Sequence, residues 1–319
     1  MKTIRDPAHA LATELAAIRA EFQVPEAFPA EVLAAARTVA GRAPTAHQDW
    51  TDEPFVTLDP ASATDLDQAF CIEAAGSDLI LHYAIADVAW FVDEGGPINT
   101  EAWARGETLY LPDGKAGLYP PVLAEGAASL LPDGPRPAVV FSVRVAPDGS
   151  VTLDAATRAV IRSRAKLAYA TVRDEDLPAG FPELSARIIE AEAERGAARV
   201  DPPEQEVSEG PDGGLTLSFR DRHPSEDRNA ALSLACNMAV ADALIAHGTA
   251  MLHASESAAL RSSDGWRSRK ERVRRPSGPS LTSCSGGSTR AAPRSASAAM
   301  IRADSSAKPA GRSSSRTVA

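Results

Sequence analysis

Hydrophobic and polar positions alternate in two ways along the first part of the chain, first at helical and then at strand spacing. Apolar residues recur at helical intervals over residues 7–21 and 29–40, and the second repeat ends at Gly41. This spacing predicts a helical leader over residues 1–50. From residue 55 the runs FVTL, AFCIEA and LILHYAIADV are short and rich in branched and aromatic residues, which is typical of strands. AGSD, between the last two runs, predicts a hairpin turn.

The rest of the first 255 residues mixes strands with helices. PAVVFSVRV and SVTLDAATRAVI flank APDG and predict a second hairpin. Helices are predicted over NTEAWARGE, with Asn99 as the cap, over residues 183–196, and from Glu226 to about His253. TLYLP and LTLSF are predicted to be extended. Because strands and helices do not alternate regularly, the pattern predicts an α+β fold with a mixed sheet and packed helices rather than a doubly wound sheet.

Residues 256–319 differ in character from everything before them. They contain 16 serines and one aromatic residue, Trp266, and they hold 13 Lys and Arg against 4 Asp and Glu, whereas residues 1–255 hold 20 against 39. Such a segment buries too little apolar surface to offset the entropy of ordering it. We therefore expect a disordered, low-complexity basic tail. Its abrupt start favours a truncation or frameshift, so that residues 51–255 would hold only the N-terminal part of a catalytic domain.

Composition narrows the class of protein further. No stretch approaches eighteen consecutive apolar residues and the first helix carries charges throughout, so we expect neither a membrane span nor a signal peptide, and a cytoplasmic location. Cys71, Cys236 and Cys284 are odd in number and widely spaced, which argues against a disulfide framework or structural zinc. Because residues 1–255 are acidic overall, any nucleic acid must bind there in a local groove with metal ions.

Three aspartates lie close together in TLDPASATDLDQ, directly after the FVTL strand. The small residues ASAT let the chain turn back, and an extended Asp65-Leu66-Asp67 would aim both carboxylates the same way, toward Asp59. Three converging carboxylates suit Mg²⁺, with Mn²⁺ as an alternative. The sequence lacks the glycine and glutamate of an EF-hand loop, and it does not fit a DxD nucleophile directly after a strand. A solvated acidic loop stays open as an alternative.

Four blocks, in order, resemble the RNase II/RNase R exoribonuclease family, whose catalytic part is the RNB domain. FVTLDPASATDLDQAF resembles the strand and aspartate run that open this domain. Its later blocks resemble LHYAIADVAWFVDEGGPINTEAWARGETLYLPDG, LYPPVLAEGAASLLPDGPRPAVVFSVRVAPDG and RAVIRSRAKLAYATV, and SEDRNAALSLACNMAVADAL is a weaker match. The resemblance implies an RNB-type catalytic domain over residues 51–255.

The resemblance also implies a reaction. Family members remove 5′-mononucleotides one at a time from the RNA 3′ end, with two cations that activate water and steady the leaving oxygen. Asp59, Asp65 and Asp67 match three of four family aspartates. Asp67 would be closest to the chemistry, Asp59 would be a metal ligand, and Asp65 would orient the terminal nucleotide or support the metal. Gln68 replaces the fourth aspartate, and its uncharged oxygen would hold a metal ion more weakly.

Two tyrosines match family tyrosines that meet the RNA. Tyr110 would stack on a base near the 3′ end, and Tyr169 would donate its hydroxyl proton to an oxygen of the scissile phosphate. Each tyrosine also fits a simpler role. Tyr110 fits a core residue on a strand, and Tyr169 fits a buried tyrosine with a backbone partner.

Several basic residues are candidates for RNA contact. Arg105 would fix its loop or touch a phosphate. Arg162, Arg164 and Lys166 alternate along IRSRAK, so an extended strand would present them as a stripe that binds the RNA backbone or as a solvated face.

His82 and Asp87 bracket the ADV strand. We predict structural roles for both, because no nucleophile lies at a matching position.

The chain also departs from the family. The arginine-rich SPIRRY-like segment that ends the family's domain has no counterpart after residue 255, and the flanking cold-shock and S1 modules of long members are not found. The leading prediction is an Mg²⁺-dependent 3′-to-5′ exoribonuclease of single-stranded RNA, impaired by truncation, with no membrane or protein partner. The alternatives are a catalytically inactive RNA-binding protein and an unrelated metal-dependent phosphoesterase.

Overall fold

The computed structural model describes residues 2–4, 10–111, 114–197, 205–209 and 215–249. The predictions for residues 250–319, which concern the tail and Cys284, lie outside the described residues.

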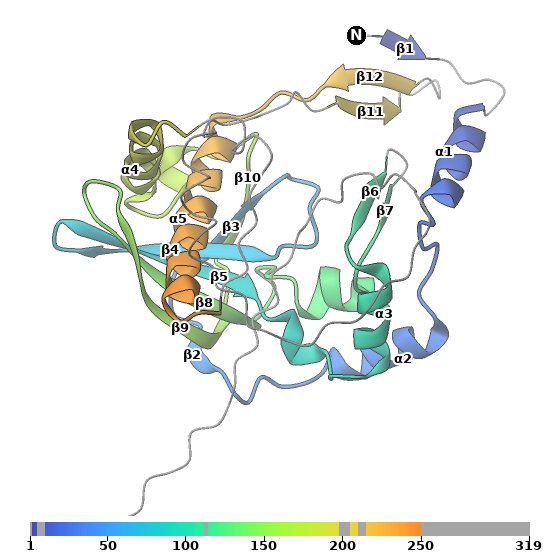
Figure 1. Ribbon diagram of the computed structural model, residues 1–319, viewed down its shortest axis with the longest axis horizontal. Coiled ribbons are helices and arrows are strands. Elements are labelled where there is room, and N and C mark those ends of the chain that lie inside the picture. The colour runs from blue at the N-terminus through green and yellow to red at the C-terminus, as the bar shows by residue number, and fades with distance from the viewer. Residues whose placement is uncertain (1, 5–9, 112–113, 198–204, 210–214, 250–319) are drawn as a thin grey trace, which may run out of the picture. The chain divides into compact units, whose positions relative to one another are not determined.

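A seven-stranded mixed sheet organises the described part of the chain, in the order β10-β3-β4-β5-β8-β9-β2 (Figure 1). The five inner strands pair with one another in antiparallel fashion, whereas the outer strands β10 and β2 run parallel to β3 and β9. The strands span Gln48–Trp50 (β2), Val56–Asp59 (β3), Gln68–Ala75 (β4), Asp78–Ala86 (β5), Arg136–Val145 (β8), Val151–Ile161 (β9) and Ala165–Ala168 (β10). Together with its helices, this sheet confirms the predicted α+β class.

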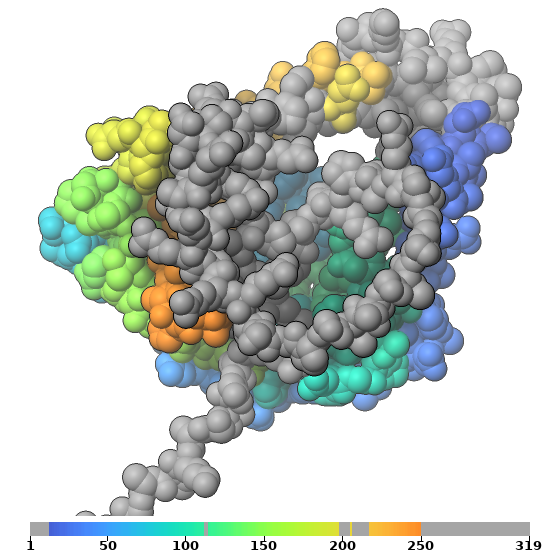
Figure 2. Space-filling view, in the orientation of Figure 1, coloured from blue at the N-terminus to red at the C-terminus, as the bar shows by residue number. Residues whose placement is uncertain are grey.

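Both predicted hairpins are present in this sheet. AGSD joins β4 to β5 and APDG joins β8 to β9, with Gly76 and Gly149 at φ of +68° and +74°. Glycine adopts this left-handed conformation without the steric cost that other residues meet. The two hairpin ends lie side by side, cyan and light green in Figure 2, and Leu79 pairs with Val145 between them.

The helices and the smaller sheets complete the described elements. The α-helices span Ala10–Glu21 (α1), Ala30–Val39 (α2), Pro97–Arg105 (α3), Phe181–Glu194 (α4) and Pro224–Ala246 (α5). Short 3₁₀-helices cover Val88–Phe91 and Asp174–Asp176, and a π-helical segment covers Leu123–Ala127. One small sheet joins Lys2–Ile4 (β1) to Leu215–Phe219 (β12) and Gln205–Glu209 (β11), and another pairs Leu109–Leu111 (β6) with Gly114–Ala116 (β7).

Two apolar clusters cover the main sheet. In the first cluster α4 and α5 contribute Phe181, Leu184, Leu232 and Ala235, which pack with sheet residues such as Leu81. The second cluster is built around Phe55, Leu66, Ala69 and Val140. Because Leu66 is the middle residue of the DLD sequence, this second cluster holds the segment that carries the aspartates.

Some sequence predictions need correction. Asn99 is not the cap of α3: the helix begins at Pro97 after Gly96, and the Asn99 side chain accepts a hydrogen bond from the Gly95 N–H over 3.2 Å. Proline fits the first helical turn because its missing N–H would be unpaired there anyway. The last long helix ends at Ala246 rather than near residue 253. The predicted helical leader also contains strands: β1 belongs to the small sheet with β12 and β11, and β2 belongs to the seven-stranded sheet.

Helix α5 is the one helix among the described residues that is long and apolar enough to cross a membrane, judged by length and composition alone, with a mean hydropathy of 1.4. Its buried apolar residues belong to the first apolar cluster. The helix at the core of a globular domain passes the same test, so we interpret α5 as a core helix.

Candidate functional site

The ends of two parallel strands place Asp59 beside Tyr169. Asp59 is the last residue of β3 and lies opposite Ala168, the last residue of β10. Tyr169 follows directly and donates its backbone N–H to the Asp59 carbonyl over 3.1 Å. Because parallel strands end at the same edge of a sheet, two residues far apart in the sequence meet there.

The aspartate segment, residues 60–67, is held by hydrogen bonds outside any regular strand. Leu66 is fully buried, and its N–H donates to Ser129 Oγ over 2.9 Å. The Ser129 hydroxyl in turn donates to the Thr64 carbonyl over 2.7 Å. Because the buried leucine and this serine fix the backbone, the two neighbouring aspartates have defined positions.

Asp59 and Asp67 form the electrostatic centre of the site. Burial raises the pKa of Asp59 to about 6, with further repulsion from Asp67 and then from Asp65. Asp59 Oδ2 is buried and has no hydrogen-bond partner among the described residues. Desolvation, together with repulsion from Asp65, also raises the pKa of Asp67. Carboxylates that repel one another in a poorly solvated place favour a cation or a proton between them.

Asp65, in contrast, is paired with a lysine. Its Oδ2 lies 2.9 Å from Lys115 Nζ, and the same ammonium lies 2.9 Å from Glu125 Oε1. Burial is the largest single effect and acts to raise the pKa of Asp65. The hydrogen bond from Lys115, backbone hydrogen bonds and the charge of Lys115 together outweigh it, so the pKa falls below its ordinary value. The charge of Asp65 is therefore balanced within the protein.

Gln68, the first residue of β4, directs its amide oxygen to the core. Its Oε1 accepts a hydrogen bond from the hydroxyl of Tyr83, a buried tyrosine whose pKa is raised by desolvation. A metal ion would have to compete with this hydroxyl for the Gln68 oxygen.

The donor set fits a divalent cation held by two carboxylates. No group of three or more His, Cys, Asp or Glu side chains within the described ranges is arranged to hold a metal ion. Asp65 acts electrostatically on both other aspartates, but its own charge is balanced by Lys115, which leaves Asp59 and Asp67 as the two candidate ligands. Mg²⁺ commonly binds one or two carboxylates and completes its shell with water and substrate phosphate. The unpaired Asp59 oxygen and the repulsion between the two carboxylates are features that such an ion would relieve.

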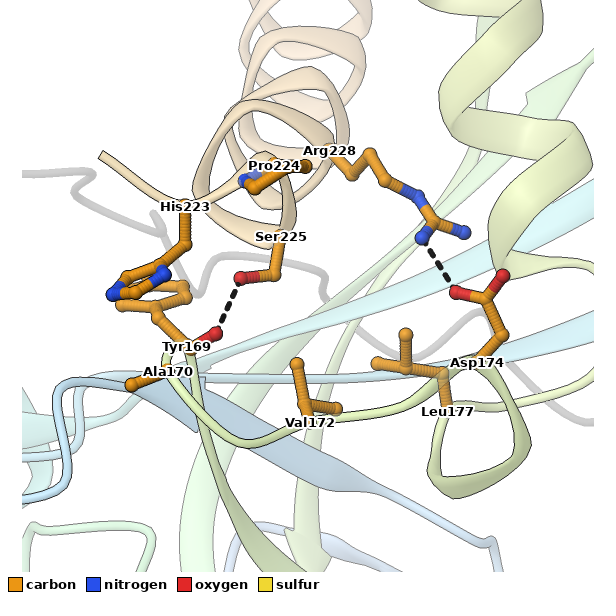
Figure 3. A pocket seen from close by; sticks show the side chains of 9 residues that line it. All are labelled: Tyr169, Ala170, Val172, Asp174, Leu177, His223, Pro224, Ser225 and Arg228. Atoms are coloured by element: carbon orange, nitrogen blue, oxygen red, sulfur yellow. Dashed lines mark hydrogen bonds and ion pairs between the residues drawn. The ribbon is translucent and has the colours of Figure 1, made fainter. Parts of the chain in front are cut away.

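Tyr169 connects the aspartates to helix α5. Its hydroxyl accepts a hydrogen bond from Asn229 Nδ2 over 2.9 Å, and its carbonyl accepts one from Ser225 Oγ over 2.8 Å. The Ser225 bond is seen in Figure 3, beside a pocket of about 260 Å³ that His223 also lines. Burial, and then the charge of Asp59, raise the pKa of Tyr169 to about 12, so the hydroxyl keeps its proton at neutral pH. The predicted alternative was a buried tyrosine with a backbone partner, whereas this tyrosine is half-buried and its hydroxyl is bonded to the Asn229 side chain.

A larger cavity of about 450 Å³ is lined by both Tyr169 and Gln68. The rest of its lining is mainly polar and comes largely from α5 and the residues before it: Arg220, Arg222, Glu226, Asn229, Ala230, Ser233, Leu234 and Asn237. Such a volume lies in the range of small-molecule sites, and the lining offers both hydrogen-bond donors and acceptors. It therefore has room for a polar ligand. None of the three aspartates is among its lining residues, and Tyr169 and Gln68 connect it to them.

Tyr110 lies on the surface of the two-stranded β6–β7 sheet. The residue is 76% exposed, which rules out the alternative of a core tyrosine. Single exposed apolar side chains are normal on a protein surface, so this exposure alone does not indicate a partner. The predicted stacking role of Tyr110 stays a prediction that this exposure permits.

The Arg105 side chain is engaged in contacts within the protein. Its Nε lies 2.7 Å from Glu101 Oε1, and its Nη atoms donate to the carbonyls of Gly117 and Ala27 over 3.1 and 2.7 Å. The guanidinium also lies 3.7 Å from the ring centroid of Phe28. Of the two predicted roles, the contacts favour fixing the loop over touching a phosphate.

The predicted basic stripe is split between internal contacts and solvent. Arg164 donates to the carbonyl of Thr51 over 2.8 Å. Lys166 donates to two carbonyls of the aspartate segment, one of them Ala61 at 2.9 Å, and its charge acts to lower the pKa of Asp59. Only Arg162 among the three lacks a described internal contact, and it is exposed. Lys166 therefore supports the aspartate segment directly.

His82 and Asp87 occupy the structural positions predicted for them. His82 Nδ1 lies 3.0 Å from Ser142 Oγ on the neighbouring strand. Asp87 is buried between His47 Nε2, at 3.0 Å, and Arg158 Nε, at 2.8 Å.

Two residues with clear roles in the site were missed by the sequence reasoning. Asn229 is a buried polar residue on the core face of α5, four positions after the buried Ser225, and this polar pair on an apolar helical face was the available signal. Lys115 gave no such signal, because its pairing with Asp65 depends on how distant segments pack.

Comparisons with known proteins agree with this architecture. The family model for the RNB domain matches residues 47–264. Ribonuclease R of Escherichia coli (strain K12) is 32% identical over 172 residues, which cover 52% of this chain and 21% of that protein. Exoribonuclease 2 of Erwinia tasmaniensis is 38% identical over 129 residues, covering 40% of this chain and 20% of that protein. The chain thus spans about a fifth of the length of these curated relatives.

Solved structures show the same fold. RNase R of Mycoplasma genitalium in complex with double-stranded RNA superimposes with a TM-score of 0.68 and 22% identity, over 75% of this chain and 46% of that chain. An active-site mutant of the Dss1 exoribonuclease from Candida glabrata gives a TM-score of 0.57 and 19% identity, over 66% of this chain and 31% of that chain. With the family model matched over most of the sequence, these likenesses show that the chain belongs to the RNB-domain family.

Proposed function

We propose that this chain is a 3′-to-5′ exoribonuclease that hydrolyses RNA with the help of Mg²⁺ and releases 5′-mononucleotides. The observation that carries the proposal is the pair of mutually repelling carboxylates, Asp59 and Asp67, beside the Tyr169 hydroxyl. The relatives named Ribonuclease R and Exoribonuclease 2 support the choice of RNA as the substrate. Mn²⁺ is an alternative cofactor for the same oxygen ligands.

The residues divide the work between binding and proton placement. Asp59 and Asp67 would hold the cation, which supplies charge neutralisation and an activated water molecule. The Tyr169 hydroxyl already accepts a hydrogen bond from Asn229, so its own proton is free to be donated to a phosphate oxygen. Tyr110 would stack on a base close to the 3′ end, and stacking of this kind does not depend on the base.

The partner in this proposal is single-stranded RNA in the cytoplasm. Stacking on Tyr110 needs unpaired bases, and the acidic composition of residues 1–255 favours a local, metal-assisted contact over a broad electrostatic one.

A second candidate function is RNA binding without hydrolysis. Two of the predicted metal ligands favour this second function because they already have partners in the protein. Asp65 is paired with Lys115, and Gln68 accepts a hydrogen bond from Tyr83. If hydrolysis requires two cations, this arrangement offers too few free ligands for the second.

A degradation assay separates the two functions. The protein is incubated with Mg²⁺ and single-stranded RNA, labelled at the 5′ end in one sample to follow shortening and labelled uniformly in another to detect mononucleotides. Asp67→Asn is the test variant, and Asp133→Asn is an acidic control on the surface. We expect the wild type and the control to shorten the RNA from its 3′ end and to release mononucleotides, and Asp67→Asn to lose at least about a hundredfold in rate while still binding RNA. RNA that is retained intact by the wild type would establish the binding function instead.

A further inference from the structure

Lys115 joins two parts of the candidate site that belong to different segments of the chain. It lies in β7 directly opposite Tyr110 in β6. Opposed residues of an antiparallel pair project from the same face, with Cβ atoms about 4.5–5.5 Å apart. The side chains of Tyr110 and Lys115 therefore leave the backbone close to each other. The ring of Tyr110 is exposed, whereas the ammonium of Lys115 is paired with Asp65.

The Lys115 ammonium makes two ion pairs that lead away from its hairpin. One partner is Asp65 in the aspartate segment and the other is Glu125 in the π-helical segment, each at 2.9 Å. The three side chains have similar exposed fractions of 34%, 33% and 31%, so none of them is freely solvated. One lysine with two carboxylate partners fixes the direction of its own side chain more closely than a single pair would.

The hairpin needs such an anchor. Its two strands have three residues each, and they form a separate two-stranded sheet that pairs with no other described strand. An isolated pair of short strands is marginally stable in water. The place of Tyr110 relative to Asp59 and Asp67 therefore depends on contacts such as those of Lys115.

We propose that Lys115 is a positioning residue for RNA binding, which anchors the hairpin of Tyr110 to the aspartate segment through Asp65 and Glu125. This inference rests on the proposed function, in which Tyr110 stacks on an RNA base. It predicts that removing the negative charge of Glu125 weakens RNA binding. Electrostatic repulsion between Glu125 and the RNA phosphates, if it acted alone, would instead make binding tighter when that charge is removed.

A double-mutant cycle on RNA affinity tests the proposal. Fluorescence anisotropy with a labelled single-stranded oligonucleotide is measured for wild type, Lys115→Met, Tyr110→Ala and the double variant. Ca²⁺ replaces Mg²⁺ in the buffer, because it binds the same oxygen ligands but supports phosphodiester hydrolysis poorly. We expect Kd to rise about tenfold for Tyr110→Ala and about threefold to fivefold for Lys115→Met. The double variant should bind as weakly as Tyr110→Ala alone, because Lys115 acts through the tyrosine.

Further variants separate positioning from other effects. Glu125→Gln should weaken binding about twofold to fivefold, and Lys115→Arg should restore most of the affinity, since arginine keeps the charge and its donors. Glu125→Gln also keeps the proposal testable if Lys115→Met does not fold. Arg173→Met is the matched control, because Arg173 likewise pairs with two carboxylates, Glu175 and Asp176, and it should bind RNA like the wild type.

Three results with variants would overturn the inference, and a fourth result concerns the wild type. Lys115→Met could leave Kd unchanged, or it could weaken binding equally in the Tyr110→Ala background, which would mean that the lysine contacts RNA itself. Tighter binding by Glu125→Gln would mean that simple repulsion governs this carboxylate. A wild-type protein that binds no RNA would overturn the proposed function as well, and this result is distinct from the other outcomes because it appears before any variant is compared.

Discussion

At the scale of single residues, the repulsion between Asp59 and Asp67 lowers the stability of the folded protein. Asp59 is desolvated, faces Asp67 and keeps one oxygen without a hydrogen bond. A buried carboxylate without a partner costs free energy unless a cation compensates it. Such costs are common where a ligand is expected to bind, since the ligand restores what folding leaves unsatisfied. The repulsion at Asp59 should therefore be measurable in the metal-free protein.

Asp59→Asn is predicted to stabilise the metal-free protein at neutral pH. The folded-state pKa of Asp59, about 6, lies above its ordinary value of 3.8, so the protonated form favours folding. The stabilising contribution of this carboxyl is complete below pH 3.8 and is lost as the pH rises through about 6. In EDTA at pH 7.5, Asp59→Asn should gain about 1–2 kcal/mol in unfolding free energy, and the gain should shrink toward pH 4.

Urea unfolding at a series of pH values measures this gain. Asp49→Asn serves as a control of opposite sign, because the hydrogen bonds from Thr51 lower the pKa of Asp49 and its carboxylate contributes to stability at neutral pH. A gain for Asp59→Asn that grows as the pH falls would contradict the assigned electrostatics.

At the scale of elements, the sequence predicts the two hairpin turns, but it does not predict which other elements pack against them. AGSD and APDG predict hairpins because glycine there allows a positive φ, and both turns are present. The sequence does not reveal that helix α4 packs directly beneath one of them. A Cβ atom added to Gly149 would lie 2.4 Å from the Arg187 carbonyl oxygen, whereas one added to Gly76 would meet nothing within 4 Å.

Gly149→Ala should therefore destabilise the protein more than Gly76→Ala does. Both positions share nearly the same positive φ, so the backbone strain of about 1–2 kcal/mol should be common to both variants. The clash with α4 should add about 1–3 kcal/mol at Gly149 alone. Urea unfolding of the two variants measures the difference directly. Equal losses would show that α4 moves aside at no cost.

The candidate site shows the same limit at the level of its elements. The strand before Asp59 is a local pattern and was predicted. The extended run predicted over IRSRAK is broken, because β9 ends at Ile161 and β10 begins at Ala165. The meeting of β3 with β10 is a pairing between distant segments, and no periodicity encodes it. For this reason the sequence identified Asp59, Asp67 and Tyr169 through resemblance, but did not reveal that Asn229 holds the tyrosine or that Lys115 holds Asp65.

At the scale of the whole molecule, charge is distributed unevenly. The chain carries a net charge of −10, with the excess of acidic residues in residues 1–255 and the excess of basic residues in residues 256–319. The acidic residues of residues 1–255 repel the phosphates of a nucleic acid, so a bound divalent cation is the main local attraction for phosphate. Every function proposed for the aspartate site thus depends on one event, the binding of a metal ion by Asp59 and Asp67.

A titration with Mn²⁺ tests that event most directly, with the free ion followed by electron paramagnetic resonance at pH 7.5. We expect the wild type to bind Mn²⁺ at a single saturable site for which Mg²⁺ competes. Asp59→Asn and Asp67→Asn should each weaken binding by about tenfold or more, because a neutral amide attracts the ion less than a carboxylate does. The surface variant Asp133→Asn should bind like the wild type. Mn²⁺ binding that is equally strong in wild type, Asp59→Asn and Asp67→Asn would show that these two aspartates do not hold the ion.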